Sequence, residues 1–233
     1  MNPAPMGKAA LIIPALDEEP AIGITLGRVP RGLFSAILVA DNGSRDRTAE
    51  IARQAGATVV SEPCRGYGNA CLRAMANLPP GIDTVVFMDA DSSDDPGEAA
   101  LLLEPILQGR ADFVLGSRTL GKAEKGSLLP HQRFGNALAT LLIRLLFRHR
   151  YSDLGPFRAI RLDALRQLDM RDRNYGWTIE MQIKAVRHGL RIEEIPVSYR
   201  NRIGVSKVSG NVKASILAGT KILWTVLRYR LCS

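Results

Sequence analysis

The sequence of 233 residues predicts an α/β fold in which a mostly parallel, doubly wound sheet is flanked by helices. Short apolar or β-branched segments alternate with helix-like segments, the pattern of successive βαβ units. Polar residues, many of them acidic, directly follow four of these apolar segments. No Pro/Gly/Ser-rich linker divides the chain. We therefore expect one domain over residues 1–210 and an amphipathic C-terminal helix over residues 211–233 that belongs to the same unit.

The N-terminal half supplies the regular part of this pattern. Runs of apolar and β-branched residues predict strands at residues 9–14, 35–40, 57–61, 84–88 and 112–116. Acidic residues after the first strand open a helix that runs to residue 26, where they complement the helix dipole. Further helices are expected at residues 49–55, 70–77 and 97–108.

The C-terminal half is predicted to be mainly helical. Helices are expected at residues 134–147, 163–168, 175–188 and about 212–229, with one strand at residues 191–199. Gly189 ends the third of these helices. The helix at 134–147 has a stripe of leucines and a basic C-terminal end. This pattern fits a core helix and a membrane-surface helix equally well.

Charge and cysteine content restrict the possible partners. The net charge is +8, but residues 1–143 sum to −3 and residues 144–233 to +11. No nucleic-acid-binding module is visible, so we expect no nucleic acid and favour an anionic membrane or phosphorylated substrates. The three cysteines have no metal-type spacing, and the N-terminus lacks a signal-peptide core. A cytoplasmic location is expected, either free or peripheral at the inner face of the cell membrane.

The most informative segment is residues 84–96. A buried strand runs directly into Asp89 and Asp91, at the strand end where open α/β sheets bind ligands. Two carboxylates separated by one small residue can meet a hard divalent cation, and a diphosphate can complete its oxygen shell. The alternative is an acidic turn in which Asp94 or Asp95 caps the next helix. Neither a Gly-x-Gly-x-x-Gly motif after the first strand nor a P-loop is present, which argues against a dinucleotide fold and a P-loop kinase.

Six short motifs occur in an order that is more specific than any one of them. Together they resemble a family 2 glycosyltransferase of the GT-A fold, and more narrowly the dolichyl-phosphate mannose and glucose synthases, which move a sugar from a nucleotide to a polyprenyl phosphate. The resemblance covers about residues 8–210. The motifs are Pro14-Ala-Leu-Asp-Glu-Glu19, Asp41-Asn-Gly-Ser-Arg-Asp46, Asp89-Ala-Asp91, Gly116-Ser-Arg118, Gly155-Pro-Phe-Arg158 and the basic stretch from Arg200 to Ser206-Lys207.

The resemblance implies a role for each motif. Asp89 and Asp91 would hold Mg²⁺ or Mn²⁺, with Ser93 as a further ligand where the synthases have Gln. The implied catalytic residues are Asp91, Asp153, Arg202 and Lys207. The implied nucleotide-binding residues are Pro14, Leu16, Glu18, Asp41 and Asp89. The implied phosphate- or acceptor-binding residues are Arg118, Arg133, Arg158, Arg202, Ser206 and Lys207.

The acceptor and the catalytic base stay open at this point. A phosphate acceptor is already ionised and needs no base, whereas an alcohol acceptor needs a carboxylate, for which Asp153 and Glu180 are the candidates. His131 is the one histidine expected near an acceptor.

Three interpretations follow: metal-dependent inverting transfer to a polyprenyl phosphate, the same donor chemistry onto a hydroxyl, or a non-catalytic nucleotide- or membrane-binding module. The apolar part of the last helix, residues 214–227, is too short to span a membrane. It suits an anionic membrane surface, a packed C-terminal helix or a homodimer seam.

Overall fold

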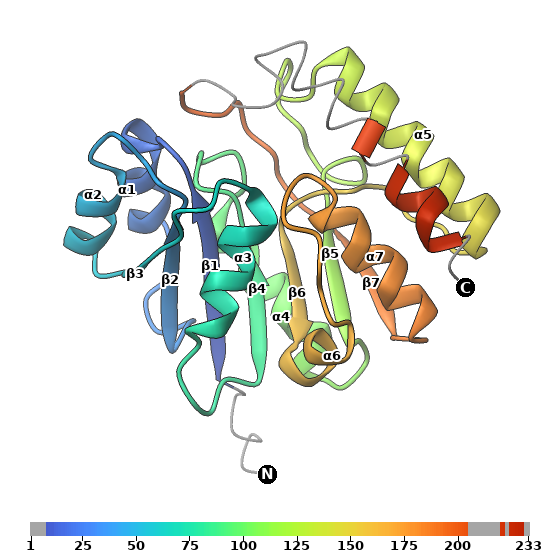
Figure 1. The fold of residues 1–233 in the computed structure, drawn as a ribbon, viewed down its shortest axis with the longest axis horizontal. Helices are drawn as coiled ribbons and strands as arrows, with labels where there is room; N and C mark the ends of the chain where they lie inside the picture. The colour runs from blue at the N-terminus through green and yellow to red at the C-terminus, as the bar shows by residue number, and fades with distance from the viewer. Residues whose placement is uncertain (1–7, 205–219, 222–223, 231–233) are drawn as a thin grey trace.

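The computed structural model describes residues 8–204, 220–221 and 224–230. Its centre is a seven-stranded sheet in the order β3-β2-β1-β4-β6-β5-β7 (Figure 1). The strands are β1 (Ala9–Ala15), β2 (Ala36–Asp41), β3 (Thr58–Ser61), β4 (Thr84–Phe87), β5 (Phe113–Ser117), β6 (Arg158–Arg161) and β7 (Ile192–Pro196). All neighbouring strands are parallel except that β6 runs antiparallel to β4 and β5. The prediction of a mostly parallel α/β sheet is confirmed.

Strand β6 is the element that the sequence pattern did not reveal. Its four residues, Arg158–Arg161, carry a charge at each end and show no long apolar run. The strand nevertheless lies in the middle of the sheet, and Arg158 is completely buried. Tertiary contacts therefore override the local signal at this position.

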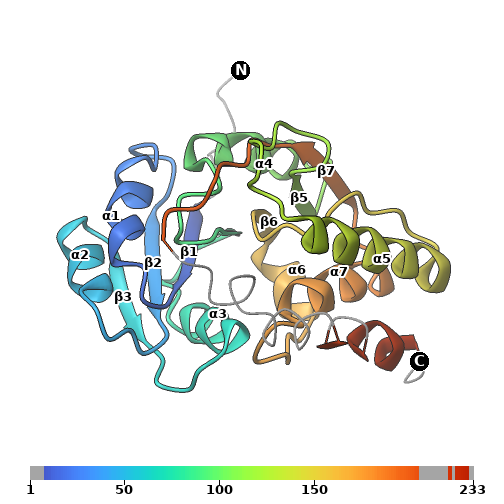
Figure 2. The same ribbon diagram turned by 90° about the horizontal axis from the view of Figure 1, so that it is seen from above.

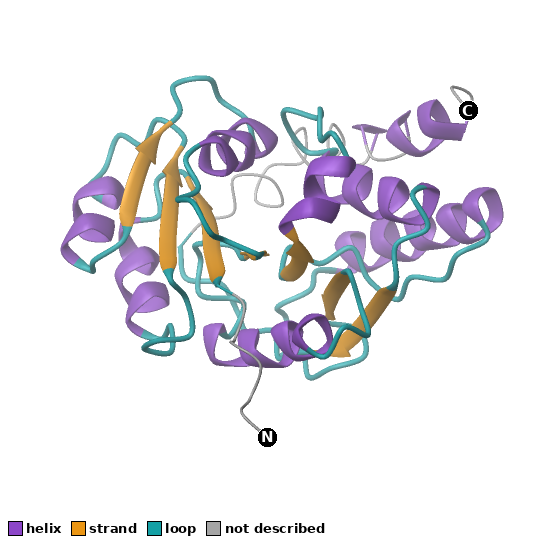
Figure 3. Cartoon of the chain, turned by 90° about the horizontal axis from the view of Figure 1, so that it is seen from below, coloured by secondary structure: helices purple, strands orange, loops and turns teal. Residues whose placement is uncertain are grey.

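Helices cover both faces of the sheet (Figures 2 and 3). They are α1 (Glu19–Gly27), α2 (Thr48–Gln54), α3 (Tyr67–Ala76), α4 (Ala99–Leu107) after a 3₁₀ turn at Pro96–Glu98, α5 (Pro130–Phe147), α6 (Leu162–Gln167) and α7 (Trp177–Arg187). Ala10 and Ile12 of β1 join the core beneath α3, α5, α6 and α7. Leu11 and Ile13 join the core beneath α1, α2 and α4. This alternation with period two gives each layer its own core.

The parallel register gathers several loops at one edge of the sheet. Ala15 at the end of β1 pairs with Asp41 at the end of β2, and β4 ends beside β1. The polar residues that follow these strands therefore meet at the carboxyl edge, which is the ligand-binding edge of open α/β sheets.

The described part of the C-terminal segment is helical and packs on α7. Val226 is completely buried, the Tyr229 hydroxyl donates to Glu180 Oε1 at 2.6 Å, and Lys221 pairs with Asp172 at 3.0 Å. Trp224 and Leu227 on the other side are 60% and 47% exposed. Within the described residues, no helix combines the length and the apolar character needed to cross a membrane.

Candidate active site

The turn after β4 is held in a strained conformation. Ser92 has a φ of 62°, in the left-handed region that a non-glycine residue rarely adopts. Its hydroxyl is bonded to the Thr25 hydroxyl of α1 at 2.6 Å, and Thr25 also donates to the Ala90 carbonyl at 2.9 Å. Strain of this kind persists where the surroundings determine the backbone, and it is frequent at functional sites.

Asp91 is supported from inside this turn. The backbone N–H and the hydroxyl of Ser93 both donate to Asp91 Oδ1, at 3.0 and 2.5 Å. Ser93 is completely buried, and its hydroxyl is directed at Asp91. The serine predicted as a further metal ligand thus lies where it orients a carboxylate.

Arg202 brings a cation to the same place. Its guanidinium lies 3.2 Å from Glu18 Oε1 and 3.3 Å from Asp91 Oδ2. The Ile203 N–H donates to the Asp91 carbonyl at 2.9 Å, which ties the two segments together. Buried Nε of Arg202 has no hydrogen-bond partner among the described residues. The positive charge of Arg202 therefore compensates part of the negative charge of two carboxylates, which follow the carboxyl ends of β1 and β4.

Asp89 and Asp94 add negative charge beside Asp91. Burial and the charge of Asp91 raise the pKa of Asp89 to about 6, although the Tyr67 hydroxyl donates to Asp89 Oδ1 at 3.1 Å. Burial together with the charges of Asp89 and Asp91 raises the pKa of Asp94 well above its usual value. Asp94 is 1% exposed, and its Oδ1 has no hydrogen-bond partner among the described residues. Clustered, desolvated carboxylates with raised pKa values are typical of functional sites.

The start of α3 can approach this cluster because two glycines flank Tyr67. A Cβ at Gly66 would lie 2.1 Å from the Arg173 carbonyl oxygen, and one at Gly68 would lie 1.9 Å from the Asp172 carbonyl oxygen. Gly66 also has a φ of 142°, which favours glycine. The glycines let α3 lie against residues 172–173, so that Tyr67 reaches Asp89.

These groups line a cavity of about 590 Å³, which we call the carboxylate cavity. It contains the predicted residues Pro14, Leu16, Glu18, Asp89, Asp91, Arg118 and Arg202, together with Asn42, Arg65, Tyr67, Gln132, Thr178 and Tyr199. The structure therefore brings together seven of the residues predicted from widely separated motifs.

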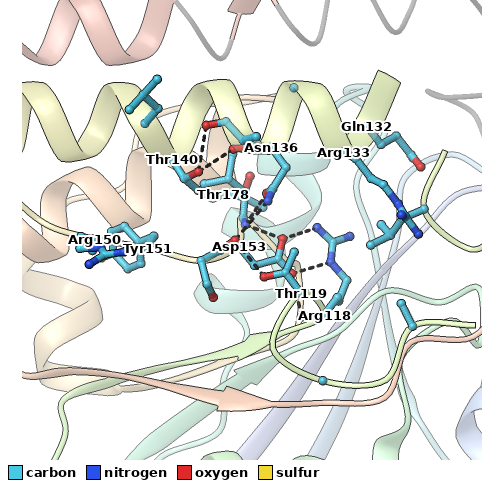
Figure 4. Close-up of a pocket in the computed structure, with 18 of the residues that line it drawn as sticks. Arg118, Thr119, Gln132, Arg133, Asn136, Thr140, Arg150, Tyr151, Asp153 and Thr178 are labelled. Atoms are coloured by element: carbon cyan, nitrogen blue, oxygen red, sulfur yellow. Dashed lines mark hydrogen bonds and ion pairs between the residues drawn. The ribbon is translucent and has the colours of Figure 1, made fainter. Parts of the chain in front are cut away.

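A second cavity of about 880 Å³ lies beside α5, and we call it the arginine cavity (Figure 4). Its basic lining residues are Arg118, His131, Arg133, Arg144 and Arg150. Arg118, Gln132 and Thr178 line both cavities. A ligand in one cavity would therefore lie next to a ligand in the other.

Arg118 at this junction is fixed by Asp153. Two guanidinium nitrogens donate to the two carboxylate oxygens at 2.8 Å each, as Figure 4 shows, and the Arg118 N–H donates to Oδ2 at 2.8 Å. Burial lowers the pKa of Arg118, but the hydrogen bonds and charge of Asp153 outweigh it, so the net shift is upward. Asp153, which is completely buried, also accepts from the Leu154 N–H at 2.8 Å. Its oxygens are thus occupied in holding Arg118.

Three other predicted residues line neither cavity. Arg158 is buried and donates to the carbonyls of Thr178, Pro156, Leu154 and Gly155, so it organises the backbone around β6. Asp41 accepts from the Ser44 N–H at 3.3 Å within its own loop.

Glu180, the second candidate base, is 1% exposed. It binds Lys184 at 2.8 Å and the Tyr229 hydroxyl, so the structure places it in a structural network. Ser206 and Lys207 lie outside the described residues.

Sequence reasoning missed the contributions of Tyr67, Asp94 and Tyr199. Tyr67 lies in a Gly-rich stretch after β3, and its position at a strand end was the available signal. Asp94 was considered only as a helix cap, whereas Asp95 performs that role by accepting from the Gly97 N–H. Tyr199 lies with its ring 4.9 Å from the Arg118 guanidinium carbon, a cation–π contact between segments that the sequence does not connect.

The donor set fits a hard divalent cation only in part. Asp89 and Asp91 supply carboxylate oxygens at the cavity surface. Oδ1 of Asp94 in the same turn has no hydrogen-bond partner among the described residues, so this oxygen can still accept a bond. Within the described residues, no three His, Cys, Asp or Glu side chains are arranged to hold a metal. A cation here would need further oxygens from a bound ligand, as Mg²⁺ does when it is held by one or two carboxylates and substrate phosphates.

Comparison with known proteins shows the family of the chain. The model of the family "Glycosyl transferase family 2" matches residues 10–169. An uncharacterized glycosyltransferase of Mycobacterium tuberculosis is 36% identical over 89% of this chain and 93% of its own length. The undecaprenyl-phosphate mannosyltransferase of Micrococcus luteus is 30% identical over 94% of this chain and 97% of its own length.

The fold also matches solved structures. Glucosyl-3-phosphoglycerate synthase from Mycobacterium tuberculosis, crystallised with Mn²⁺, uridine diphosphate and phosphoglyceric acid, superimposes with a TM-score of 0.77. The match covers 96% of this chain and 78% of that one at 23% identity. The expected GT-A fold and the resemblance to the dolichyl-phosphate sugar synthase group are thereby confirmed. The family match extends through the strand ends that carry Glu18, Asp89, Asp91 and Arg118, and the protein is a glycosyltransferase that belongs to family 2.

Proposed function

We propose that this glycosyltransferase moves a sugar from a UDP- or GDP-sugar to the phosphate of a polyprenyl-type lipid, with inversion and with the help of Mg²⁺ or Mn²⁺. The observation that carries the proposal is the junction of the two cavities. A carboxylate-rich cavity suited to a metal-bound nucleotide diphosphate meets an arginine-rich cavity at Arg118. Two relatives support the two halves of the proposal: the glucosyl-3-phosphoglycerate synthase was crystallised with Mn²⁺ and UDP, and the Micrococcus luteus enzyme is an undecaprenyl-phosphate mannosyltransferase.

The carboxylate cavity would hold the donor. Glu18 after β1 provides carboxylate oxygens for a nucleoside, and Pro14 and Leu16 provide apolar walls. Asp89 and Asp91 would hold the divalent cation, which when bound would screen the diphosphate charge. Arg202 would then exchange its contacts with Glu18 and Asp91 for the leaving phosphates. A cation aimed at developing negative charge stabilises the transition state most.

The arginine cavity would hold a phosphate acceptor. Asp153 is its only acidic lining residue among those described, and both of its oxygens bind Arg118. A hydroxyl acceptor would need a free carboxylate to accept its proton, whereas a phosphate is ionised at neutral pH. The placement of Asp153 and Glu180 thus favours phosphate over alcohol. The same preference for an anion follows from Arg133, which has no ion pair within the described residues.

A transfer assay tests this proposal. The protein would be incubated with a panel of UDP- and GDP-sugars, polyprenyl phosphate in detergent, and Mn²⁺, Mg²⁺ or excess EDTA. We expect one donor class to give a lipid-linked sugar, with loss of product in EDTA and in Asp91→Ala. Asp163→Ala, an exposed change on α6, serves as the matched control and should keep the wild-type rate. Full turnover in EDTA would reject the metal, and the absence of lipid product with every donor would reject the acceptor.

A further inference from the structure

The loop between α6 and α7 forms one wall of the carboxylate cavity. Asn174 and Tyr175 of this loop line the cavity. On its other side, the Asn69 N–H at the start of α3 donates to the Arg173 carbonyl at 3.0 Å. The loop therefore also supports the first turn of α3, which borders the same cavity.

Two carboxylates hold the backbone of this loop. Glu180 accepts from the N–H groups of Arg171 and Asp172, at 3.1 and 2.7 Å. The Asp172 carboxylate in turn accepts from the N–H groups of Asn174 and Gly176, at 2.8 and 3.1 Å. Hydrogen bonds to a charged acceptor are stronger than bonds between neutral groups, so these four bonds restrict the loop.

The C-terminal helix, red in Figure 1, binds both of these carboxylates. The Tyr229 hydroxyl donates to Glu180 at 2.6 Å, and the Lys221 ammonium lies 3.0 Å from Asp172. Neither Tyr229 nor Lys221 lines the carboxylate cavity or the arginine cavity. Their contacts connect the C-terminal helix to the cavity wall through the loop.

We propose that Glu180 and Asp172 are positioning residues for the sugar donor, and that the C-terminal helix completes this arrangement through Tyr229 and Lys221. The hydroxyl and the ammonium group fix the two carboxylates, and the carboxylates fix the backbone of residues 171–176. That backbone fixes one wall of the carboxylate cavity. The inference rests on the proposed function, because it takes this cavity as the donor site. It gives Glu180 a role that involves no proton transfer.

Hydrogen exchange tests the contact between the C-terminal helix and the loop. In Tyr229→Phe and in Lys221→Met, we expect exchange at least about fivefold faster at the four amides that bind Glu180 and Asp172, because local opening becomes easier. The amides of β1 and β4 should exchange at the wild-type rate, since neither variant removes an apolar side chain from the core. Arg230→Met is the matched control, because it removes a cation from an exposed position on the same helix.

Nucleotide binding tests the consequence for the donor site. UDP or GDP would be titrated with Mn²⁺ by calorimetry into the full-length protein. We expect each of the two variants to bind the nucleotide about three- to tenfold more weakly, the effect of losing one bond to a charged group. Lys221→Arg, which keeps the cation, should restore the wild-type affinity, and Arg230→Met should keep it. The double variant should lose less than the product of the two single losses, because both act on one loop.

The two measurements separate this inference from the proposed function. Wild-type exchange in the loop of both variants would overturn the inference, and so would a nucleotide affinity that stays unchanged while the loop exchanges faster. Equally faster exchange in β1, β4 and the loop would show that the helix only stabilises the whole fold. A wild-type protein that binds neither nucleotide would reject the donor site of the proposed function, whereas the exchange rates would still decide whether the C-terminal helix holds the loop.

Discussion

At the residue scale, the position of Arg202 between Glu18 and Asp91 leads to a kinetic prediction. Because its cation can move to the leaving diphosphate, Arg202→Ala should lower turnover at saturating donor by more than tenfold, while the donor KM rises less. Loss of one well-placed charge donor typically costs roughly 3 kcal/mol in the transition state, about a hundredfold in rate. Arg200→Ala is the matched control, since Arg200 pairs with Asp95 at 2.6 Å and does not line the carboxylate cavity. Equal turnover in the two variants would contradict the role of Arg202.

A variant of Asp153 tests whether this residue positions Arg118, with which it forms an ion pair, or acts as a catalytic base. Asp153→Asn removes one charge of a buried pair, for which the typical cost is about 3–5 kcal/mol of stability. We expect a lower melting temperature, a reduced rate with polyprenyl phosphate, and a pH–rate profile of unchanged shape. If Asp153 were the base, the variant would instead lose the acidic limb of the profile. Kinetics from pH 5 to 9 with both proteins provide the comparison.

The raised pKa of Asp89 predicts a cost in stability. Burial and the charge of Asp91 raise this pKa to about 6, above the value of about 3.9 in an unfolded chain. Stability contributed by the protonated carboxyl is therefore present at low pH and is lost as the pH rises through about 6. Asp89→Asn should melt a few degrees higher than the wild type at pH 7.5 in EDTA, and the difference should shrink towards pH 4.5. A lower melting temperature at pH 7.5 would show that Asp89 is stabilised by its partners.

At the scale of elements, the C-terminal helix has two sides with different expected roles. Val226 is completely buried and Tyr229 binds Glu180, whereas Trp224 is 60% exposed. Val226→Asp should destabilise the fold by several kcal/mol, because it buries a charge without a partner. Trp224→Ser should leave the melting temperature nearly unchanged and reduce binding to anionic vesicles. Equal melting temperatures for the two variants would mean that the helix does not pack as described.

The elements also show what sequence patterns can predict. The bounds of β4 and α7 agree with the sequence prediction to within about two residues, whereas α3 and α5 begin about three and four residues before their predicted starts. The short strand β6 was missed because its burial depends on β4 and β5 and not on its own pattern. The predicted division at residue 210 lies outside the described residues and stays a prediction.

At the scale of the whole molecule, the sequence motifs predict the position of the carboxylate cavity. They do not predict where this cavity meets the arginine cavity. Strand ends that carry acids predict a shared edge, because parallel strands finish on the same side of a sheet. The contacts between Arg118 and Asp153, and between Arg118 and Tyr199, join segments far apart in sequence. The placement of Arg158 in the interior likewise follows from packing, since a motif does not distinguish an arginine that binds phosphate from one that binds carbonyls.

The central claim is that the acceptor is a phosphate carried by a lipid. The most direct test compares initial rates of sugar transfer to a polyprenyl phosphate and to the matching polyprenol, at equal chain length and saturating donor and metal. We predict transfer to the phosphate at least about a hundredfold faster, since no carboxylate among the described residues of the arginine cavity is free to activate a hydroxyl. Comparable or faster transfer to the polyprenol, abolished by Asp153→Asn, would contradict this account.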